Sequence, residues 1–178
     1  VHLDINGGEP SASKNYKRIL QNLPPNLKSL RLNTNCSLVI EELEDIVASG
    51  VDVTVTASLD GIGDVHDYVR WPIKWDKFYS NLMIYKDMNV KLNTWTTVSA
   101  LNIRDFKNII KFVKQNKLYH SYAFLEKPDV LSVKYRNKFT SACAGQFDLV
   151  ATERNNDLEL DIFLQEQDNI RGIDEAFR

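Results

Sequence analysis

Segments that favour β-strands alternate with segments of helical periodicity along the first 125 residues. Apolar or alternating runs rich in β-branched residues predict five strands, at about residues 1–6, 27–33, 51–58, 90–98 and 119–125. Helical spacing of apolar residues separates them, at residues 13–22, 39–49, 74–88 and 104–116. Parallel neighbours need long crossover connections, which helices supply. The sequence therefore predicts an α/β fold with a parallel sheet.

This alternation leaves two architectures open, a doubly wound open sheet and a partial (β/α) barrel. In both, ligands bind at the carboxyl ends of the strands. After Pro128 the alternation stops, and the remaining residues favour helical or irregular structure. We therefore expect a core domain at residues 1–128 and a helical C-terminal appendage at residues 129–178.

Charge and cysteine content narrow the function classes. A formal net charge of −2 provides no basic field for a phosphate backbone, so we expect no nucleic-acid partner. No apolar run approaches the roughly 20 residues that a membrane helix needs, so we expect no membrane partner and a cytoplasmic location. The two cysteines, Cys36 and Cys143, suit a reducing compartment and cannot alone ligate a four-cysteine cluster.

The first predicted strand runs into the turn Gly7, Gly8, Glu9 and Pro10. Two glycines let the backbone turn tightly and approach a ligand, and the proline fixes the exit direction. A carboxylate beside bare carbonyls at a strand end suits an ammonium group, which needs three acceptors. An ordinary strand-to-helix turn with a surface glutamate explains the same residues.

Polar residues also follow the second and third predicted strands. Thr34 and Asn35 end the second strand, and Ser58 and Asp60 end the third. Each alone fits a turn or a small sheet position, but together they point to a shared pocket at the carboxyl ends. The connection at residues 62–72 is long for a compact α/β unit, and we expect it to be a functional or mobile loop.

Two residues of that connection carry chemistry. Arg70 is suited to clamp a carboxylate with two parallel hydrogen bonds. His66 either orients a neighbour or is satisfied by local hydrogen bonds, and one histidine without partners is weak evidence of catalysis.

The ordered set Gly7-Gly8-Glu9-Pro10, Thr34-Asn35, Ser58-Leu59-Asp60-Gly61, His66-Asp67 and Arg70 resembles the radical SAM superfamily, especially the branch with SPASM or twitch extensions. The resemblance spans about residues 1–126. It implies a partial (β/α) barrel of six strands, of which this chain would hold five. The first strand and its loop, with the C-x-x-x-C-x-x-C ligands of a [4Fe–4S] cluster, are then expected upstream of Val1.

The resemblance also implies an activity. Radical SAM enzymes bind S-adenosylmethionine (SAM) beside the cluster and cleave it reductively to a 5′-deoxyadenosyl radical, which abstracts hydrogen from the substrate. Here the substrate is an unknown peptide or small molecule, and the electron donor is a protein such as flavodoxin or ferredoxin. We expect no catalytic residue and no metal ligand within this chain, and no activity from it alone.

Carried over by position, the turn with Glu9 would hold the ammonium of SAM, and Ser58 would face its carboxylate or ribose. Arg70 would pair with the carboxylate, whereas Asp60 is expected to fix the loop. Residues at the end of the fourth strand would lie near the ribose and adenine, although Asn102 also fits a helix cap or turn. The cofactor-binding residues expected are Gly7, Gly8, Glu9, Pro10, Asn35, Ser58, Asp60, Arg70, Thr97, Val98 and Asn102.

The sequence departs from the family at two places. Cys36 stands where the family usually has glycine, so either the turn differs or Asn35 takes the unusual backbone geometry. Only Cys143 lies downstream, so no auxiliary cluster is predicted in this chain.

The same residues leave two other functions open. One is a barrel hydrolase that uses the carboxylates of Glu9, Asp60 and Glu126. The other is a non-catalytic α/β domain that binds a partner.

Overall fold

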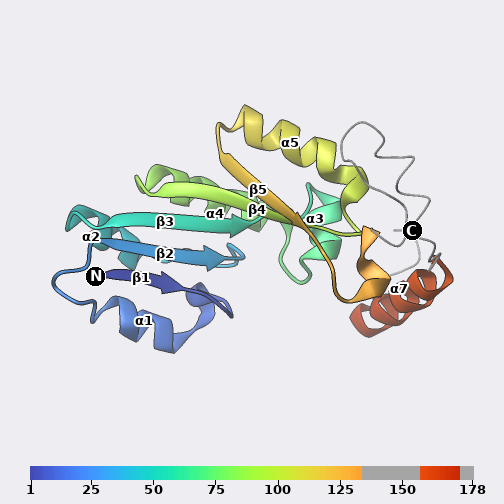
Figure 1. Ribbon diagram of the computed structural model, residues 1–178, viewed down its shortest axis with the longest axis horizontal. Coiled ribbons are helices and arrows are strands. Elements are labelled where there is room, and N and C mark those ends of the chain that lie inside the picture. The colour runs from blue at the N-terminus through green and yellow to red at the C-terminus, as the bar shows by residue number, and fades with distance from the viewer. Residues whose placement is uncertain (134–156, 173–178) are drawn as a thin grey trace. The chain divides into compact units, whose positions relative to one another are not determined.

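The computed structural model describes residues 1–133 and 157–172, and its described part contains one five-stranded sheet (Figure 1). The strands follow the chain in the order β1-β2-β3-β4-β5. Their bounds are β1 His2–Ile5, β2 Ser29–Thr34, β3 Asp52–Ser58, β4 Lys91–Val98 and β5 Tyr119–Phe124. Successive pairs from β1 to β4 are parallel. The predicted fold class, a five-stranded parallel α/β structure with a helical C-terminal part, is confirmed.

Helices lie at the four places between the strands where the sequence predicted them. Their bounds are α1 Lys14–Leu20, α2 Glu42–Ala48, α3 Asp64–Val69, α4 Trp75–Asp87, α5 Phe106–Gln115 and α7 Asp157–Arg171, with 3-10 turns η1 Pro10–Ala12, η2 Ile103–Asp105 and η3 Asp129–Leu131. The expectation of a loop throughout residues 62–72 is wrong, because α3 occupies six of them. A helix of that length is too short to show a clear apolar period. No helix in the described ranges is long and apolar enough to span a membrane.

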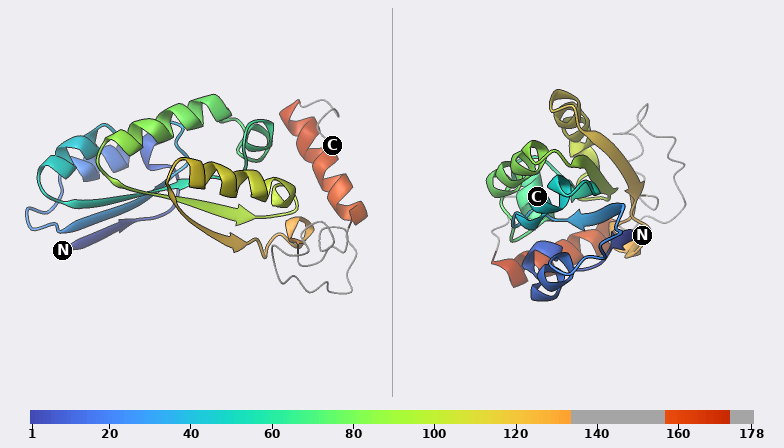
Figure 2. Two further views of the ribbon diagram at one scale, coloured as in Figure 1. Left: turned by 90° about the horizontal axis from the view of Figure 1, so that it is seen from above. Right: turned by 90° about the vertical axis from the view of Figure 1, so that its left-hand side faces the viewer.

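The core lies on one face of the sheet. Along β3 buried and partly exposed residues alternate, with Val53, Val55 and Ala57 turned to the core. Phe78 and Leu82 of α4 are also buried, and α1, α2 and α4 lie on the same side of the strands (Figure 2, left). Parallel sheets are usually covered on both faces. The other face carries none of these three helices, so its side chains are available to line a cavity.

The chain divides into two compact units. The first comprises residues 1–97 and 105–122, and the second comprises residues 98–104 and 123–178. Within the second unit the Leu125 amide donates to the Val98 carbonyl at 2.8 Å, and the Ala100 amide donates to the Leu131 carbonyl at 2.8 Å. The domain boundary expected at residue 128 stays a prediction.

Candidate functional site

Glu9 ties the turn after β1 to the carboxyl end of β2. Its Oε1 accepts hydrogen bonds from the Ser11 amide at 3.0 Å, the Ser11 hydroxyl at 2.6 Å and the Thr34 hydroxyl at 2.7 Å. Its Oε2 accepts a hydrogen bond from the backbone amide of Asn35 at 2.6 Å. Since Glu9 is also the N-cap of η1, one partly buried carboxylate fixes two loops that lie 25 residues apart in the sequence.

These bonds change the role expected of the Glu9 carboxylate. A carboxylate offers about four acceptor sites, and protein donors already make four hydrogen bonds to it, three of them on Oε1. Oε2 alone keeps room for another donor. In this structure Glu9 therefore stabilises the turn. Its direct contact with an ammonium group stays a prediction.

The two glycines of the turn have the backbone geometry that requires them. Gly7 has φ +89° and Gly8 has φ +65°, and a Cβ built on either would meet nothing within 4 Å. Glycine is therefore needed here for its left-handed backbone and not for want of space. The Gly7 carbonyl accepts a 2.6 Å hydrogen bond from the Tyr16 hydroxyl. The neighbouring Pro10 is buried at the start of η1.

The turn after β2 places its unusual backbone on Cys36. Cys36 has φ 56°, while Asn35 is not among the residues with positive φ. Of the two alternatives for this turn, the one in which Asn35 takes the unusual geometry is therefore wrong. The side chains close the turn instead: the Cys36 amide donates to the Thr34 hydroxyl at 3.0 Å, and Asn35 Oδ1 accepts from the Ser37 amide at 2.9 Å.

Cys36 has a buried thiol that stays protonated. Its side chain is fully buried, and burial, followed by the negative charge of Glu9, raises the pKa of the thiol far above its ordinary value. A thiol must lose its proton to bind a metal. Within residues 1–133 and 157–172 there is no group of three or more His, Cys, Asp and Glu residues that could hold a metal ion.

We expect Cys36 to resist alkylation in the folded protein because the thiol is both buried and protonated. Brief treatment with iodoacetamide at pH 8, followed by peptide mass spectrometry, measures the reaction at each cysteine separately. Cys36 should react at least tenfold faster in 6 M guanidinium chloride than in buffer. Equal rates in the two solutions would show that the thiol is accessible in the folded state.

Asp60 and Arg70 form an ion pair after β3. Arg70 Nη2 lies 2.8 Å from Asp60 Oδ2, and the two side chains are 26% and 9% exposed. Asp60 Oδ1 accepts a 2.7 Å hydrogen bond from the Thr97 amide of β4. Burial raises the pKa of Asp60, although the charge of Arg70 and the hydrogen bond from Thr97 act against the rise. Asp60 therefore fixes the loop to β4. Arg70 uses its Nη2 group in the ion pair with Asp60.

Ser58 has a hydroxyl available for a ligand. It is the last residue of β3, is partly exposed, and pairs in register with Trp95 of β4. Its hydroxyl makes no hydrogen bond within the described residues. Beside it, the Leu59 amide donates to the Trp95 carbonyl at 2.8 Å, which continues the β3–β4 pairing beyond the strand end.

Trp95 lies beside the candidate site and was not predicted from the sequence. Its side chain is 38% exposed, and it alternates along β4 with the buried Thr94 and Thr96. It therefore lies on the same sheet face as its partner Ser58. The signal was present in the sequence as a large aromatic residue two positions from the polar strand end.

The predicted residues of the first unit gather at the carboxyl ends of β1 to β4. Thr34 pairs in register with Ala57, so Asn35 follows beside Ser58. The pKa of Cys36 responds to the charges of both Glu9 and Arg70. The residues brought together in this way are Gly7, Gly8, Glu9, Pro10, Asn35, Ser58, Asp60, Arg70 and Thr97.

Val98 and Asn102 belong to the second unit. Val98 is fully buried and Asn102 is 1% exposed. Asn102 Oδ1 accepts a 2.8 Å hydrogen bond from the Ser99 amide, which is the bond expected of a turn residue. A ligand role for either residue stays a prediction.

His66 is a buried, neutral residue of α3. Its ring lies 4.4 Å from that of Phe78 and 5.5 Å from that of Trp75, and neither ring nitrogen has a hydrogen-bond partner of good geometry in the described ranges. Burial and then the charge of Arg70 lower its pKa to about 4, although the charge of Asp67 and the Gly61 backbone act in the opposite sense. The alternative of a histidine satisfied by local hydrogen bonds stays a prediction.

We expect the buried His66 to make stability fall in acid. Its folded pKa of about 4 lies below its ordinary value of 6.5, so the unfolded chain binds more protons between these values. The contribution of His66 is present above pH 6.5 and is lost as the pH falls toward 4. Urea unfolding should show a loss on the order of 1–2 kcal/mol between pH 7 and pH 5. An unchanged slope in His66→Leu would contradict this assignment.

The comparisons with known proteins give a likeness of structure alone. No family model matches the chain, and no curated protein matches it. The structure of Streptococcus suis SuiB bound to S-adenosylmethionine is similar with a TM-score of 0.54 and 14% identity, over 97% of this chain and 36% of that one. Native anSMEcpe with bound AdoMet is similar with a TM-score of 0.56 and 18% identity, over 96% of this chain and 47% of that one. SuiB bound to precursor peptide SuiA gives a TM-score of 0.56 at 15% identity, over 97% of this chain and 36% of that one.

These likenesses define the class of fold. The solved structures are radical SAM partial barrels, and this chain is similar to them in fold. The chain spans between about a third and a half of the length of the structures just named.

Proposed function

We propose that the chain is the SAM-binding core of a radical SAM enzyme, related by its motifs to the SPASM and twitch branch. The observation that carries the proposal is the pinned turn at the carboxyl edge of a partial barrel. There Glu9 binds both its own turn and the Asn35 amide at the end of β2. The similar SuiB and anSMEcpe structures contain S-adenosylmethionine, which supports SAM as the ligand of this edge.

The described residues suit the methionyl end of SAM. An ammonium group needs oxygen acceptors, and the turn offers the remaining site on Glu9 Oε2 beside the exposed residues Gly7 and Gly8. A carboxylate needs donors, and the unbonded Ser58 hydroxyl and the remaining donors of Arg70 are suitable. We assign Thr97, Val98 and Asn102 to the ribose and adenine side by their order along the chain.

The cluster belongs, in this proposal, to a part of the protein upstream of these residues. The chain contains only Cys36 and Cys143, and Cys36 is buried. A four-cysteine cluster supplies the electron for SAM cleavage when bound, and flavodoxin or ferredoxin is the donor we propose. A peptide substrate is supported by the structures of SuiB with precursor peptide SuiA and anSMEcpe with Cp18Cys peptide.

The two other functions are less well supported. A carboxylate hydrolase needs Glu9 and Asp60 free to move protons, but Glu9 accepts four internal hydrogen bonds and Asp60 is paired with Arg70. A non-catalytic domain would have no need of an unbonded serine and an open glycine turn at one edge.

Ser58→Ala tests the SAM site with little disturbance of the fold, because the Ser58 hydroxyl makes no hydrogen bond to the described residues. We expect SAM affinity, measured by calorimetric titration, to fall about two- to tenfold, which is the range of one neutral hydrogen bond. Ser80→Ala is the control, since Ser80 is exposed on α4, on the helical side of the sheet. Unchanged affinity in Ser58→Ala, or an equal loss in both variants, would remove Ser58 from the site.

A further inference from the structure

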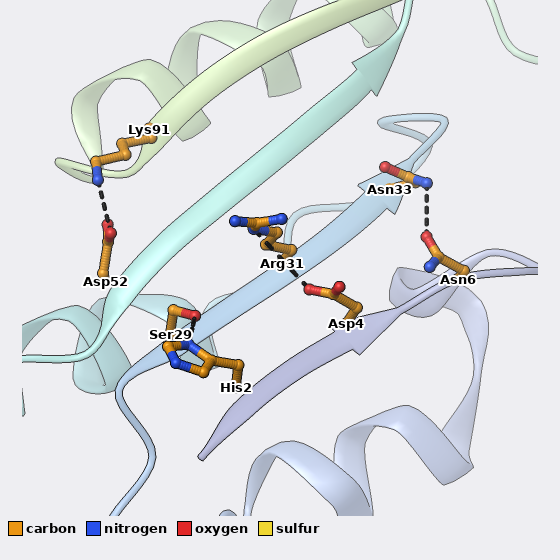
Figure 3. Close-up of polar contacts among 8 residues, drawn as sticks. All are labelled: His2, Asp4, Asn6, Ser29, Arg31, Asn33, Asp52 and Lys91. Carbon is orange, nitrogen blue, oxygen red and sulfur yellow. Dashed lines mark hydrogen bonds and ion pairs between the residues drawn. The ribbon is translucent and has the colours of Figure 1, made fainter.

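A polar cavity lies on the helix-free face of the sheet in the first unit. Its volume is about 840 Å³, and side chains of β1 to β4 line it. Figure 3 shows cross-strand pairs on this face. His2 Nδ1 lies 2.7 Å from Ser29 Oγ, and Asn33 Nδ2 donates to Asn6 Oδ1 at 3.0 Å. A face so rich in hydrogen-bonding groups favours a polar occupant.

The two ion pairs of this face differ in tightness. Lys91 Nζ lies 2.6 Å from Asp52 Oδ2, a distance at which the lysine charge is satisfied. Arg31 Nε lies 4.0 Å from Asp4 Oδ1, beyond hydrogen-bond range, and the side chains of Arg31 and Asp4 are 69% and 56% exposed. In Figure 3 the Arg31 guanidinium lies over β2 beside Asp4.

Arg31 is therefore a cation of this cavity whose guanidinium makes no hydrogen bond within the described residues, and unlike the ammonium of Lys28 it has the planar geometry for two parallel bonds. The charge of Asp4 holds the Arg31 guanidinium in place, but at 4.0 Å Asp4 accepts no hydrogen bond from its Nε–H group. With Lys28, which also lines the cavity, the lining has three cations against the two carboxylates Asp4 and Asp52. The excess is one positive charge, and a guanidinium with free donors binds a carboxylate through two parallel hydrogen bonds.

We propose that Arg31 binds a carboxylate of the substrate, so that the enzyme acts on an acidic molecule such as a peptide with an Asp or Glu side chain. This rests on the proposed function, which puts SAM at the adjoining edge. Arg31 lies four residues before Asn35, about 13 Å along an extended strand. The carboxylate would thus bind on the sheet face below the strand ends, and Asp4 is a positioning residue for Arg31.

The test uses two synthetic pentapeptides, acetyl-Gly-Gly-Glu-Gly-Gly-amide and its glutamine counterpart. Nuclear magnetic resonance follows the Arg31 Nε–H signal of the 178-residue chain during titration. The glutamate peptide should shift the signal and the glutamine peptide should not. Arg31→Gln should weaken binding of the glutamate peptide at least tenfold, read from backbone amides of β1 and β2. The matched control Lys91→Gln removes a charge from the same cavity and should change affinity less than threefold, because Asp52 already satisfies Lys91.

Equal shifts with both peptides, or unchanged affinity in Arg31→Gln, would overturn the proposal. Inorganic phosphate is a separate arm, and a response to phosphate without one to the glutamate peptide would also overturn the carboxylate assignment. SAM titration of the same samples keeps the two proposals distinct. Arg31→Gln should leave SAM affinity unchanged, whereas failure of the proposed function would appear as no SAM binding in any sample.

Discussion

Asp60→Asn should lower the free energy of unfolding by about 1–3 kcal/mol, because the loss of the Arg70 pair outweighs the relief of the buried charge that raises the pKa of Asp60. Removing one partner of a fully buried ion pair costs about 3–5 kcal/mol because it leaves the other charge uncompensated. Asp60 is 9% exposed, but Arg70 is 26% exposed, so solvent offsets part of that cost. The substituted amide can still accept from the Thr97 amide, so the loss reports chiefly the charge. Urea unfolding monitored by circular dichroism at pH 7 measures it.

Asp52→Asn is the matched control for this effect. It makes the same chemical change in a pair whose side chains are 51% and 67% exposed, and such surface pairs contribute about 1 kcal/mol or less. The double variant Asp60→Asn with Arg70→Gln should lose less than the sum of the two single losses, because it leaves no unpaired charge. Equal losses in Asp60→Asn and Asp52→Asn would show that the Asp60 pair is not a buried anchor.

Glu9→Gln should weaken SAM binding about tenfold or more. The carboxylate accepts four hydrogen bonds from donors of its own turn and the end of β2. A glutamine amide nitrogen cannot accept, so at least one donor would face another donor. Losing a hydrogen bond to a charged group costs about 1.5–3 kcal/mol, and the turn would also lose its fixed position. Calorimetric titration with SAM and urea unfolding should both register the change.

Glu44→Gln is the control for Glu9→Gln because Glu44 is exposed on α2. It should leave SAM affinity and stability close to those of the unsubstituted chain. Loss of stability without loss of SAM affinity in Glu9→Gln would mean that the turn is structural and does not form part of the SAM site.

The sequence predicted the parts of this structure that depend on local pattern. The strand and helix limits agree with the alternation of apolar periods, and the polar residues Asn35 and Ser58 follow the strands as expected. The helix α3 was missed because its six residues lie between Gly63 and Arg70, too few for a recognisable period. Close packing also matters there, since a Cβ on Gly61 would approach the His66 amide nitrogen to 2.7 Å.

The partners of the site residues could not be predicted in the same way. Glu9 and Arg70 were chosen as groups for a ligand, yet their strongest contacts are with the protein itself. These contacts join residues distant in sequence, such as Thr97 with Asp60, which are 37 positions apart. Pairing of that kind depends on strand register and burial. A sequence motif does not specify whether a charged residue pairs with another residue of the protein or with a ligand. Cys36 likewise shows its positive φ only in three dimensions.

Formation of 5′-deoxyadenosine tests the proposed radical SAM activity most directly. The protein extended upstream to include the expected cluster cysteines would be reconstituted anaerobically with iron and sulfide, then given SAM and dithionite. Chromatography should detect 5′-deoxyadenosine from this brown, extended protein. The 178-residue chain treated alike should stay colourless and form none, because two cysteines cannot supply a four-thiolate site. Absence of 5′-deoxyadenosine from an extended protein with a full cluster, or its formation by the 178-residue chain alone, would contradict the proposal.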